Sequence, residues 1–212
     1  PPEPFLELEN EGKTVVCVGT DEELLGVIAI SDRIRPEAET VIAHLHDAGI
    51  EVVIITGDND GTARSVAEEL SIDHYHSELL PEDKVAEIEH LKKEYGSIAM
   101  VGDGINDAPA LAKADVGIAM GAAGSDTAIE TADIALMGDN LNHVVYAVRL
   151  SRQGERIIQQ NIISSIGVKL FLALGVIPGF VNLITAVLVG DMAVTFGITG
   201  NAMRLRGIQS QE

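Results

Sequence analysis

Two long apolar segments limit what the C-terminal part of this chain can fold into. They cover residues 162–177 and 180–198, and Pro178 and Gly179 separate them. A helix needs about 20 apolar residues to cross about 30 Å of hydrocarbon, and residues 157–158 can extend the first segment toward that length. The pattern predicts a hairpin of two transmembrane helices. The alternative is a buried pair of helices in the core of a soluble protein.

Positive charge flanks this hairpin on one side. Arg149, Arg152 and Arg156 precede the first segment, and Arg204 and Arg206 follow the second. Membrane proteins retain Lys and Arg on the cytoplasmic side of the membrane. We therefore expect both ends of the hairpin, and the soluble part that precedes it, in the cytoplasm.

Acidic residues are concentrated in the soluble part. The chain has 33 acidic and 14 basic side chains and a formal charge of −19, yet residues 149–212 contain 3 of the acids and 6 of the bases. This balance excludes a basic nucleic-acid-binding protein, so we expect no nucleic acid partner. The hydrophobic content of 46% excludes disorder of the whole chain. Such a dense acidic surface predicts a halophile source with high internal salt, because salt screens the self-repulsion.

Short apolar strands alternate with helical patterns in the soluble part. The expected strands are residues 25–30, 51–55, 97–101, 116–120 and 134–137. Parallel strands need crossover connections, and helices then cover both faces of the sheet. The sequence predicts an α/β fold with a doubly wound, Rossmann-type parallel sheet. Ligands of such a sheet bind beyond the carboxyl ends of its strands.

Two aspartates follow one of these strands. Asp103 and Asp107 are four residues apart at the start of a helix, and Asn106 lies between them. Close carboxylates repel unless a cation or a proton lies between them, and hard oxygen ligands suit Mg²⁺ that keeps water and phosphate ligands. These residues predict a Mg²⁺ site.

A second polar loop follows another strand. Thr56, Gly57 and Asp58 offer a hydroxyl group and free amides before a helix, where phosphate oxygens bind. Lys84 lies in the first turn of a helix, where the dipole disfavours a cation unless an anion is near. Each feature alone is also typical of a turn, a cap or a solvated side chain. Together they indicate Mg²⁺-dependent phosphoryl transfer.

Four motifs give the chain a family resemblance. They are TGDN at 56–59, LLPEDK at 79–84, GDGINDAPAL at 102–111 and DVGIAMG at 115–121. In this order they resemble the phosphorylation domain of P-type ATPases, which has a haloacid-dehalogenase-like fold. The resemblance extends over the two C-terminal membrane helices.

The resemblance implies site residues and cofactors. Thr56 would contact the transferred phosphoryl group and Lys84 would neutralise it. The implied catalytic residues are Thr56, Gly57, Asp58, Lys84 and Asn106, and the implied Mg²⁺ ligands are Asp103 and Asp107. The cofactors would be Mg²⁺ and ATP, with ATP bound largely by a nucleotide-binding domain outside this chain.

The nucleophile of the family is missing from this sequence. P-type ATPases are phosphorylated on the aspartate of a DKTGT motif, and no aspartate here precedes Lys-Thr. The resemblance implies that residues 1–24 end a nucleotide-binding domain, 25–148 form the phosphorylation domain, 149–206 form two transmembrane helices with cytoplasmic flanks, and 207–212 form a tail. We expect this chain alone to be inactive and the remaining N-terminal part of the pump to be its partner.

Two opposite charges lie within the apolar segments. Lys169 and Asp191 stand at hydrocarbon depth, where ionisable groups are costly unless they are paired or functional. A lysine in the first helix with an aspartate in the second resembles the zinc-, cadmium- and lead-exporting class of pumps. Asp191 would then bind the transported ion and Lys169 would supply a counter-charge. A carboxylate also suits a divalent ion better than copper(I), although Ala193 replaces the glycine that is usual in this class.

The resemblance implies ATP-driven export of a divalent heavy-metal cation (zinc, cadmium, lead or cobalt) through an aspartyl-phosphate intermediate. Such a pump is a multi-pass protein of the plasma membrane, so the lipid bilayer and the metal ion would be its partners. Two other functions stay open. The chain could be a separately encoded, non-catalytic or regulatory partner of a pump, or a membrane-tethered phosphatase of the same superfamily. The phosphatase would need an Asp-x-Asp nucleophile near its N-terminus, which the sequence lacks.

Overall fold

The computed structural model describes residue 8 and residues 13–20, 23–30, 33–103, 106–121 and 126–207. The chain divides into two compact units, Pro1–Leu141 and Asn142–Glu212. Among the residues singled out above, Gly104 and Ile105 of the aspartate loop lie outside the described part, as does 208–212 of the predicted tail.

The first unit begins with an antiparallel hairpin. β1 (Thr14–Gly19) pairs with β2 (Leu24–Ile30), with Val15 opposite Ala29 and Cys17 opposite Val27. Residues 25–30 were predicted among the parallel strands, and the observed antiparallel pairing corrects this. The physical reason is the short connection, because neighbouring parallel strands need a crossover of a dozen or more residues.

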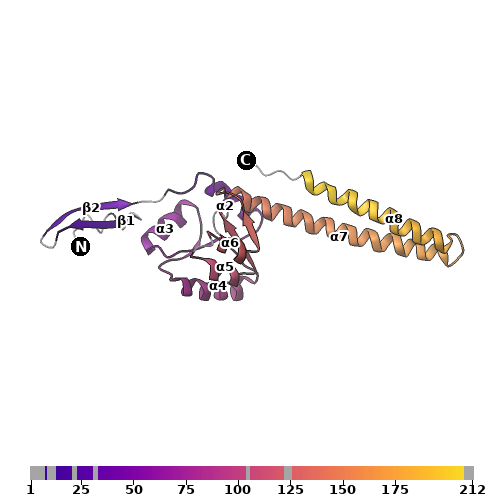
Figure 1. The fold of residues 1–212 in the computed structure, drawn as a ribbon, viewed down its shortest axis with the longest axis horizontal. Coiled ribbons are helices and arrows are strands. Elements are labelled where there is room, and N and C mark those ends of the chain that lie inside the picture. Colours follow the sequence, from indigo (N-terminus) through magenta and orange to yellow (C-terminus); the bar gives the residue numbers. More distant parts are fainter. Residues whose placement is uncertain are drawn as a thin grey trace. The chain divides into compact units, whose positions relative to one another are not determined.

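The rest of the first unit alternates helices and strands (Figure 1). In chain order these are α2 (Ala38–Asp47), β3 (Val53–Ile55), α3 (Asp60–Glu69), β4 (His74–His76), α4 (Pro81–Tyr95), β5 (Ala99–Gly102), α5 (Ala108–Lys113), β6 (Val116–Met120), α6 (Asp126–Thr131) and β7 (Ile134–Leu136). β3 pairs with β4, and β5, β6 and β7 form a ladder in that order, all of them parallel. The predicted α/β class with a parallel sheet is confirmed.

Local signals in the sequence explain where the helices of this unit begin and end. α4 starts with Pro81 at its first turn, and the Asp83 carboxylate accepts a hydrogen bond from the Leu80 amide at 3.1 Å. Its end coincides with Gly96, whose φ of +90° is accessible to glycine and strained for other residues. Asn59 caps α3 by accepting a hydrogen bond from the Thr62 amide at 2.9 Å.

A small apolar core joins α4 and α5 to β3 and β5. Ile88 of α4 and Leu111 of α5 are 2% and 1% exposed, and Met100 of β5 packs with them. Ile55 of β3 packs against the same cluster, so the two parallel ladders share one core. This shared core holds the loops that follow β3 and β5 near one another.

Gly117 of β6 allows a close approach of α5 to the sheet. A Cβ atom at this position would lie 2.7 Å from the Leu111 carbonyl oxygen, which is too close for any real side chain. The Gly117 amide also donates a hydrogen bond to the Asp133 carboxylate at 2.8 Å. Glycine is therefore required here by packing.

We predict that Gly117→Ala lowers the local unfolding free energy of β6 by about 1–3 kcal/mol, because the added methyl group forces backbone shifts in a packed core. Amide hydrogen exchange of the chain in detergent would measure this change. Gly26→Ala is the matched control, since its added Cβ would meet no described atom within 4 Å. Equal protection of β6 in both variants would contradict the prediction.

The second unit is a pair of antiparallel helices (Figure 1). α7 (Asn142–Val176) has 35 residues and α8 (Leu183–Ala202) has 20, and a short 3₁₀ helix, η2 (Met203–Gly207), follows. α7 begins well before the predicted apolar segment, so Arg149, Arg152 and Arg156 lie on the same continuous helix.

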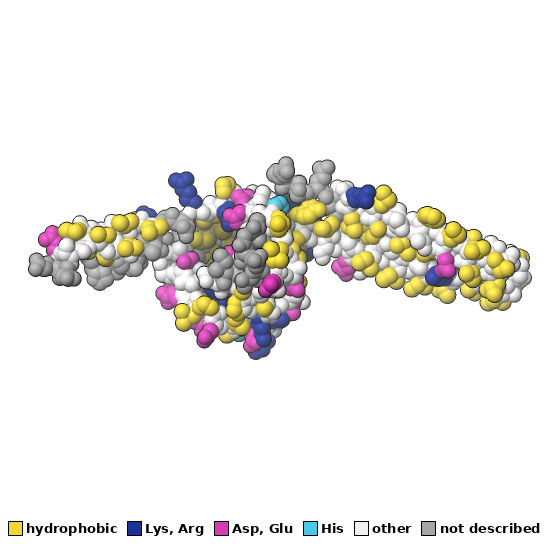
Figure 2. Space-filling view, viewed as in Figure 1, with side chains coloured by type: hydrophobic (Ala, Val, Ile, Leu, Met, Phe, Trp, Pro, Cys, Tyr) yellow, Lys and Arg dark blue, Asp and Glu magenta, His cyan; other side chains and the backbone are white. Residues whose placement is uncertain are grey.

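Both helices are long and apolar enough to cross a membrane. In their most apolar stretches, 6% and 11% of the residues are buried within the structure, which is unlike the core helices of a soluble protein. Figure 2 shows hydrophobic side chains along the surface of this hairpin, and Phe171, Phe180 and Phe196 are among the most exposed. These observations favour the predicted transmembrane hairpin over a buried helical pair.

Candidate functional site

The loop after β3 is held by its own hydrogen bonds. The Thr56 hydroxyl donates to the Asp58 carboxylate at 2.8 Å and accepts from the Asp58 amide at 3.1 Å. Thr56 also lies at the end of the β3–β4 ladder, because its amide donates to the His76 carbonyl oxygen at 2.9 Å. Asp58 therefore orients the Thr56 hydroxyl at the carboxyl edge of the sheet.

A neighbouring segment fastens this loop to the start of α4. The Leu79 amide donates to the Thr56 carbonyl oxygen at 3.1 Å, and the Glu78 amide donates to the Asp58 carbonyl oxygen at 2.8 Å. A Cβ atom at Gly57 would lie 3.2 Å from the Leu79 carbonyl oxygen, so the backbones are close. Glu78 adopts a left-handed φ of 57°. The sequence did not predict this conformation, because glycine and asparagine are the residues that usually indicate it.

Lys84 and Asp107 form the central ion pair of the site. Lys84 Nζ lies 2.7 Å from Asp107 Oδ1, and the two side chains are 15% and 18% exposed. Lys84 lies in the first turn of α4, and Asp107 is the residue immediately before α5. The carboxylate supplies the negative charge that offsets the unfavourable position of a lysine at a helix N-terminus.

The other end of α4 is held by a second ion pair. Lys92 Nζ lies 2.8 Å from Asp115 Oδ1, and the Ile98 amide donates to Asp115 Oδ2 at 3.0 Å. The hydrogen bond from Lys92, followed by that from Ile98, lowers the pKa of the Asp115 carboxyl group. α4 is thus attached at both ends to the segment that contains α5, and this attachment fixes the position of Lys84.

Asp107 lies over the end of β5. Asp103 directly follows Gly102, and a Cβ atom at Gly102 would lie 3.0 Å from Asp107 Oδ2. The Asp107 carboxylate therefore reaches back over the strand end from which Asp103 emerges. Asn106 lies between Asp107 and the undescribed pair 104–105.

The donor chemistry at this edge fits Mg²⁺. Asp103, Asn106 and Asp107 offer only oxygen acceptors and an amide, the hard ligands that Mg²⁺ prefers. In the part of the chain that the structure describes, no three His, Cys, Asp or Glu side chains form a cage that could hold a metal ion. A small number of protein ligands is typical of Mg²⁺, which keeps several water molecules and binds substrate phosphate.

A second candidate site lies in the hairpin. Lys169 Nζ of α7 is 3.6 Å from Asp191 Oδ1 of α8, so the two charges predicted at hydrocarbon depth face one another. The Thr195 hydroxyl donates to the Asp191 carbonyl oxygen at 2.7 Å, one helical turn further along. Thr195 was not predicted, because a threonine bonded to its own helix leaves no distinct sequence pattern.

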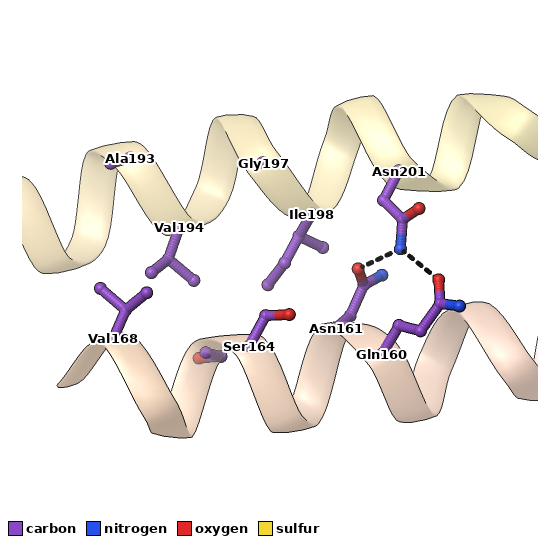
Figure 3. Close-up of a pocket in the computed structure, with 10 residues that line it drawn as sticks. Gln160, Asn161, Ser164, Val168, Ala193, Val194, Gly197, Ile198 and Asn201 are labelled. Carbon is purple, nitrogen blue, oxygen red and sulfur yellow. Dashed lines mark hydrogen bonds between the residues drawn. The ribbon is translucent and has the colours of Figure 1, made fainter. Parts of the chain in front are cut away.

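A pocket of about 420 Å³ lies between α7 and α8 (Figure 3). Amide and hydroxyl side chains line it together with small and β-branched residues: Gln160, Asn161, Ser164, Ser165, Val168, Ala193, Val194, Gly197, Ile198 and Asn201. Sequence reasoning missed this cluster, because neutral polar residues in an apolar segment show no charge pattern.

Breaking the Lys84–Asp107 pair should reveal its contribution to stability. A double-mutant cycle of Lys84→Met and Asp107→Asn should give a coupling energy of about 1–2 kcal/mol, because both groups are largely shielded from water. Chemical denaturation of the α/β unit, followed by hydrogen exchange in α4 and α5, would measure it.

The matched control for this cycle is the exposed pair Arg64–Asp60, whose side chains are 57% and 48% exposed. Its coupling energy should be below about 0.5 kcal/mol, as is usual for surface pairs. Equal coupling in the two cycles would show that Lys84–Asp107 is an ordinary surface pair.

Comparison with known proteins gives consistent matches. Residues 3–115 match the family described as haloacid dehalogenase-like hydrolase. The chain is 49% identical over 205 residues to a probable cadmium-transporting ATPase of Staphylococcus aureus (strain MRSA252), covering 96% of this chain and 28% of that protein. It is 51% identical over 159 residues to a zinc-transporting ATPase of Bacillus subtilis (strain 168), covering 75% of this chain and 25% of that protein.

A solved structure has a similar fold. The crystal structure of a zinc-transporting PIB-type ATPase in the E2.Pi state aligns with a TM-score of 0.84 and 42% identity. The alignment covers 95% of this chain and 33% of that structure. This chain therefore spans between a quarter and a third of the length of the proteins that it matches.

Proposed function

Because the chain belongs to the haloacid dehalogenase-like hydrolases and its resemblance to heavy-metal P-type ATPases is confirmed, we propose that it acts in ATP-driven export of a divalent heavy-metal cation. It would supply the phosphate- and Mg²⁺-binding part of the phosphorylation domain and two membrane helices. The observation that carries this proposal is the Lys84–Asp107 pair beside the Thr56 loop at one sheet edge.

The residues at this edge have distinct proposed roles in phosphoryl transfer. The Gly57 amide would bind phosphoryl oxygens, as would the Thr56 hydroxyl once its proton turns from the Asp58 carboxylate to the phosphoryl group. Asp58 would orient Thr56 through its amide, and Lys84 would neutralise the phosphoryl charge. Asp103 and Asp107, with Asn106, hold Mg²⁺, which when bound neutralises further phosphate charge. Lys84 Nζ lies 2.7 Å from Asp107 Oδ1. When it contacts a phosphoryl group, the Lys84 ammonium would therefore donate hydrogen bonds to both the phosphoryl oxygens and Asp107.

The missing nucleophile would lie on a strand between the two parallel ladders. Among the described strands β3 pairs only with β4 and β5 only with β6, although Ile55 of β3 packs into the core that contains Met100 of β5. A further parallel strand between β3 and β5 would end between Thr56 and Asp103. We place the phosphorylated aspartate of DKTGT on such a strand, contributed by the remaining N-terminal part of the pump.

This chain incubated alone with labelled ATP and Mg²⁺ should form no acid-stable, hydroxylamine-labile phosphoprotein, because its sequence contains no DKTGT aspartate. Gel analysis at acidic pH would measure the label. An intact pump containing this sequence should be labelled under the same conditions. Labelling of this chain alone would show that it carries its own nucleophile.

The membrane hairpin supplies the proposed ion site. Asp191 would bind the divalent cation (zinc, cadmium, lead or cobalt), and Lys169, 3.6 Å away, would replace the ion as its partner after release. Arg204 contacts Gln160 at 3.3 Å, so the positive residues on both flanks of the hairpin lie at the same end. That arrangement supports a plasma membrane orientation with the soluble unit in the cytoplasm.

In the intact pump, Asp191→Ala should abolish zinc-stimulated phosphorylation by ATP, because the ion loses its carboxylate ligand. Phosphorylation by inorganic phosphate should persist, because the Thr56 and Lys84 edge is unchanged. Thr199→Ala, at an exposed position of the same helix, is the matched control. Zinc stimulation that survives Asp191→Ala would rule out the proposed role of Asp191.

A further inference from the structure

The contacts between α7 and α8 define a single antiparallel register. Asn161 contacts Asn201, Lys169 contacts Asp191, and a Cβ atom at Gly190 would lie 3.3 Å from Leu172. Nearer the turn, a Cβ atom at Gly175 would lie 3.0 Å from Val181. As the residue number on α7 increases, the number of its contact residue on the second segment decreases. One continuous antiparallel register requires this order.

Three hydrogen bonds join the two helical segments at the end opposite the turn, and Figure 3 shows the two that Asn201 donates. Asn201 Nδ2 donates to Asn161 Oδ1 at 2.9 Å and to Gln160 Oε1 at 3.3 Å. The Arg204 guanidinium donates to Gln160 Oε1 at 3.3 Å and, within its own segment, to Asn201 Oδ1 at 3.1 Å. We call Gln160, Asn161 and Asn201 the amide clamp.

The packing next to the amide clamp does not select the register by itself. The pocket of about 420 Å³ separates the helices there, and its apolar lining of Val168, Val194 and Ile198 repeats along the helices with similar side chains. In a membrane, lipid chains are as apolar as these residues, so the hydrophobic effect does not distinguish one register from another. Interhelical hydrogen bonds and close small-residue contacts make that distinction.

A slip of one helical turn would move one helix by about 5.4 Å against the other. This displacement breaks the bonds of Asn201 to Asn161 and Gln160, and it exceeds the 3.6 Å that separates Lys169 Nζ from Asp191 Oδ1. The amide clamp and the charged pair are therefore satisfied in the same register.

We propose that Asn201, with Asn161 and Gln160, is a positioning residue that sets the register of α8 on α7 and so holds Asp191 beside Lys169. The importance of this for transport rests on the proposed function, in which Asp191 binds the exported ion. The register itself is a property of the hairpin and can be tested independently of transport.

Cysteine cross-linking of this chain in lipid vesicles tests the register. In a Cys17→Ser background, Val168→Cys with Val194→Cys reports the observed register, because these two side chains point toward one another (Figure 3). Val168→Cys with Ile198→Cys reports a slip of one turn. Adding Asn201→Leu should lower the ratio of the first product to the second by roughly 3- to 10-fold, which is the range expected for losing one or two interhelical hydrogen bonds in a membrane.

Two further variants and a control separate the effect of the amide group from a general effect of substitution. Asn201→Gln retains an amide and should preserve most of the cross-linking ratio, whereas Asn161→Leu removes a partner and should lower it. Thr199→Leu is the matched polar-to-apolar control at an exposed position of α8 and should leave the ratio unchanged. An unchanged ratio in both Asn201→Leu and Asn161→Leu would overturn the proposal.

Zinc dependence of the intact pump tests the link to Asp191. Asn201→Leu should raise the zinc concentration for half-maximal phosphorylation by ATP several-fold and leave phosphorylation by inorganic phosphate unchanged. A shifted cross-linking ratio with unchanged zinc dependence would overturn the positioning role. Zinc stimulation that survives Asp191→Ala would instead overturn the proposed function, and the cross-linking ratio would still decide whether the amide clamp sets the register.

Discussion

The ion pair between Lys84 and Asp107 is the contact on which the candidate phosphoryl-transfer edge depends. It joins the first turn of α4 to the residue before α5, and both side chains are mostly shielded from water. Each partner explains the other's position, because the carboxylate balances a lysine at a helix N-terminus and the ammonium group reduces the repulsion between neighbouring aspartates. The ion pair thus neutralises one of the carboxylates at this edge.

The core beneath this ion pair gives it a fixed geometry. Ile88 lies on the same helix as Lys84, and Leu111 lies on the helix that Asp107 precedes, so their burial orients the two charged groups. The Lys92–Asp115 pair holds the far end of α4. Lys84 and Asp107 are therefore held in contact by the packing of the helices that carry or adjoin them.

The helical hairpin also holds its charged pair in a fixed geometry, but through different interactions. Burial of apolar side chains organises the α/β unit, but in a membrane the lipid around the apolar stretches of α7 and α8 would remove that driving force between them. Polar contacts and close glycines then decide how the helices meet. The amide clamp lies at one end of the hairpin, the Gly175–Val181 contact lies near the turn, and the Lys169–Asp191 pair lies between them.

The sequence predicted most strands and helices of the α/β unit, because hydrophobic runs, Pro81 and Gly96 mark their ends locally. It failed for residues 25–30, where strand propensity was correct but the pairing partner depended on a short connection to β1. The apolar pattern also marked only part of the first long helix, because residues 142–156 continue α7 without belonging to the apolar segment. Pairing and helix continuity depend on neighbours that a local pattern does not specify.

The residue types of the two sites, their order and the family resemblance were determined by the sequence alone. Thr56, Lys84, Asp103 and Asp107 are chemically suited to phosphate and Mg²⁺ wherever they lie, and Lys169 and Asp191 are conspicuous in apolar segments. Only the tertiary structure decided that Asp58 orients Thr56, that Lys84 contacts Asp107, and that an amide clamp joins the two helices of the hairpin at one end. These contacts join residues through space, at distances set by the packing of whole helices.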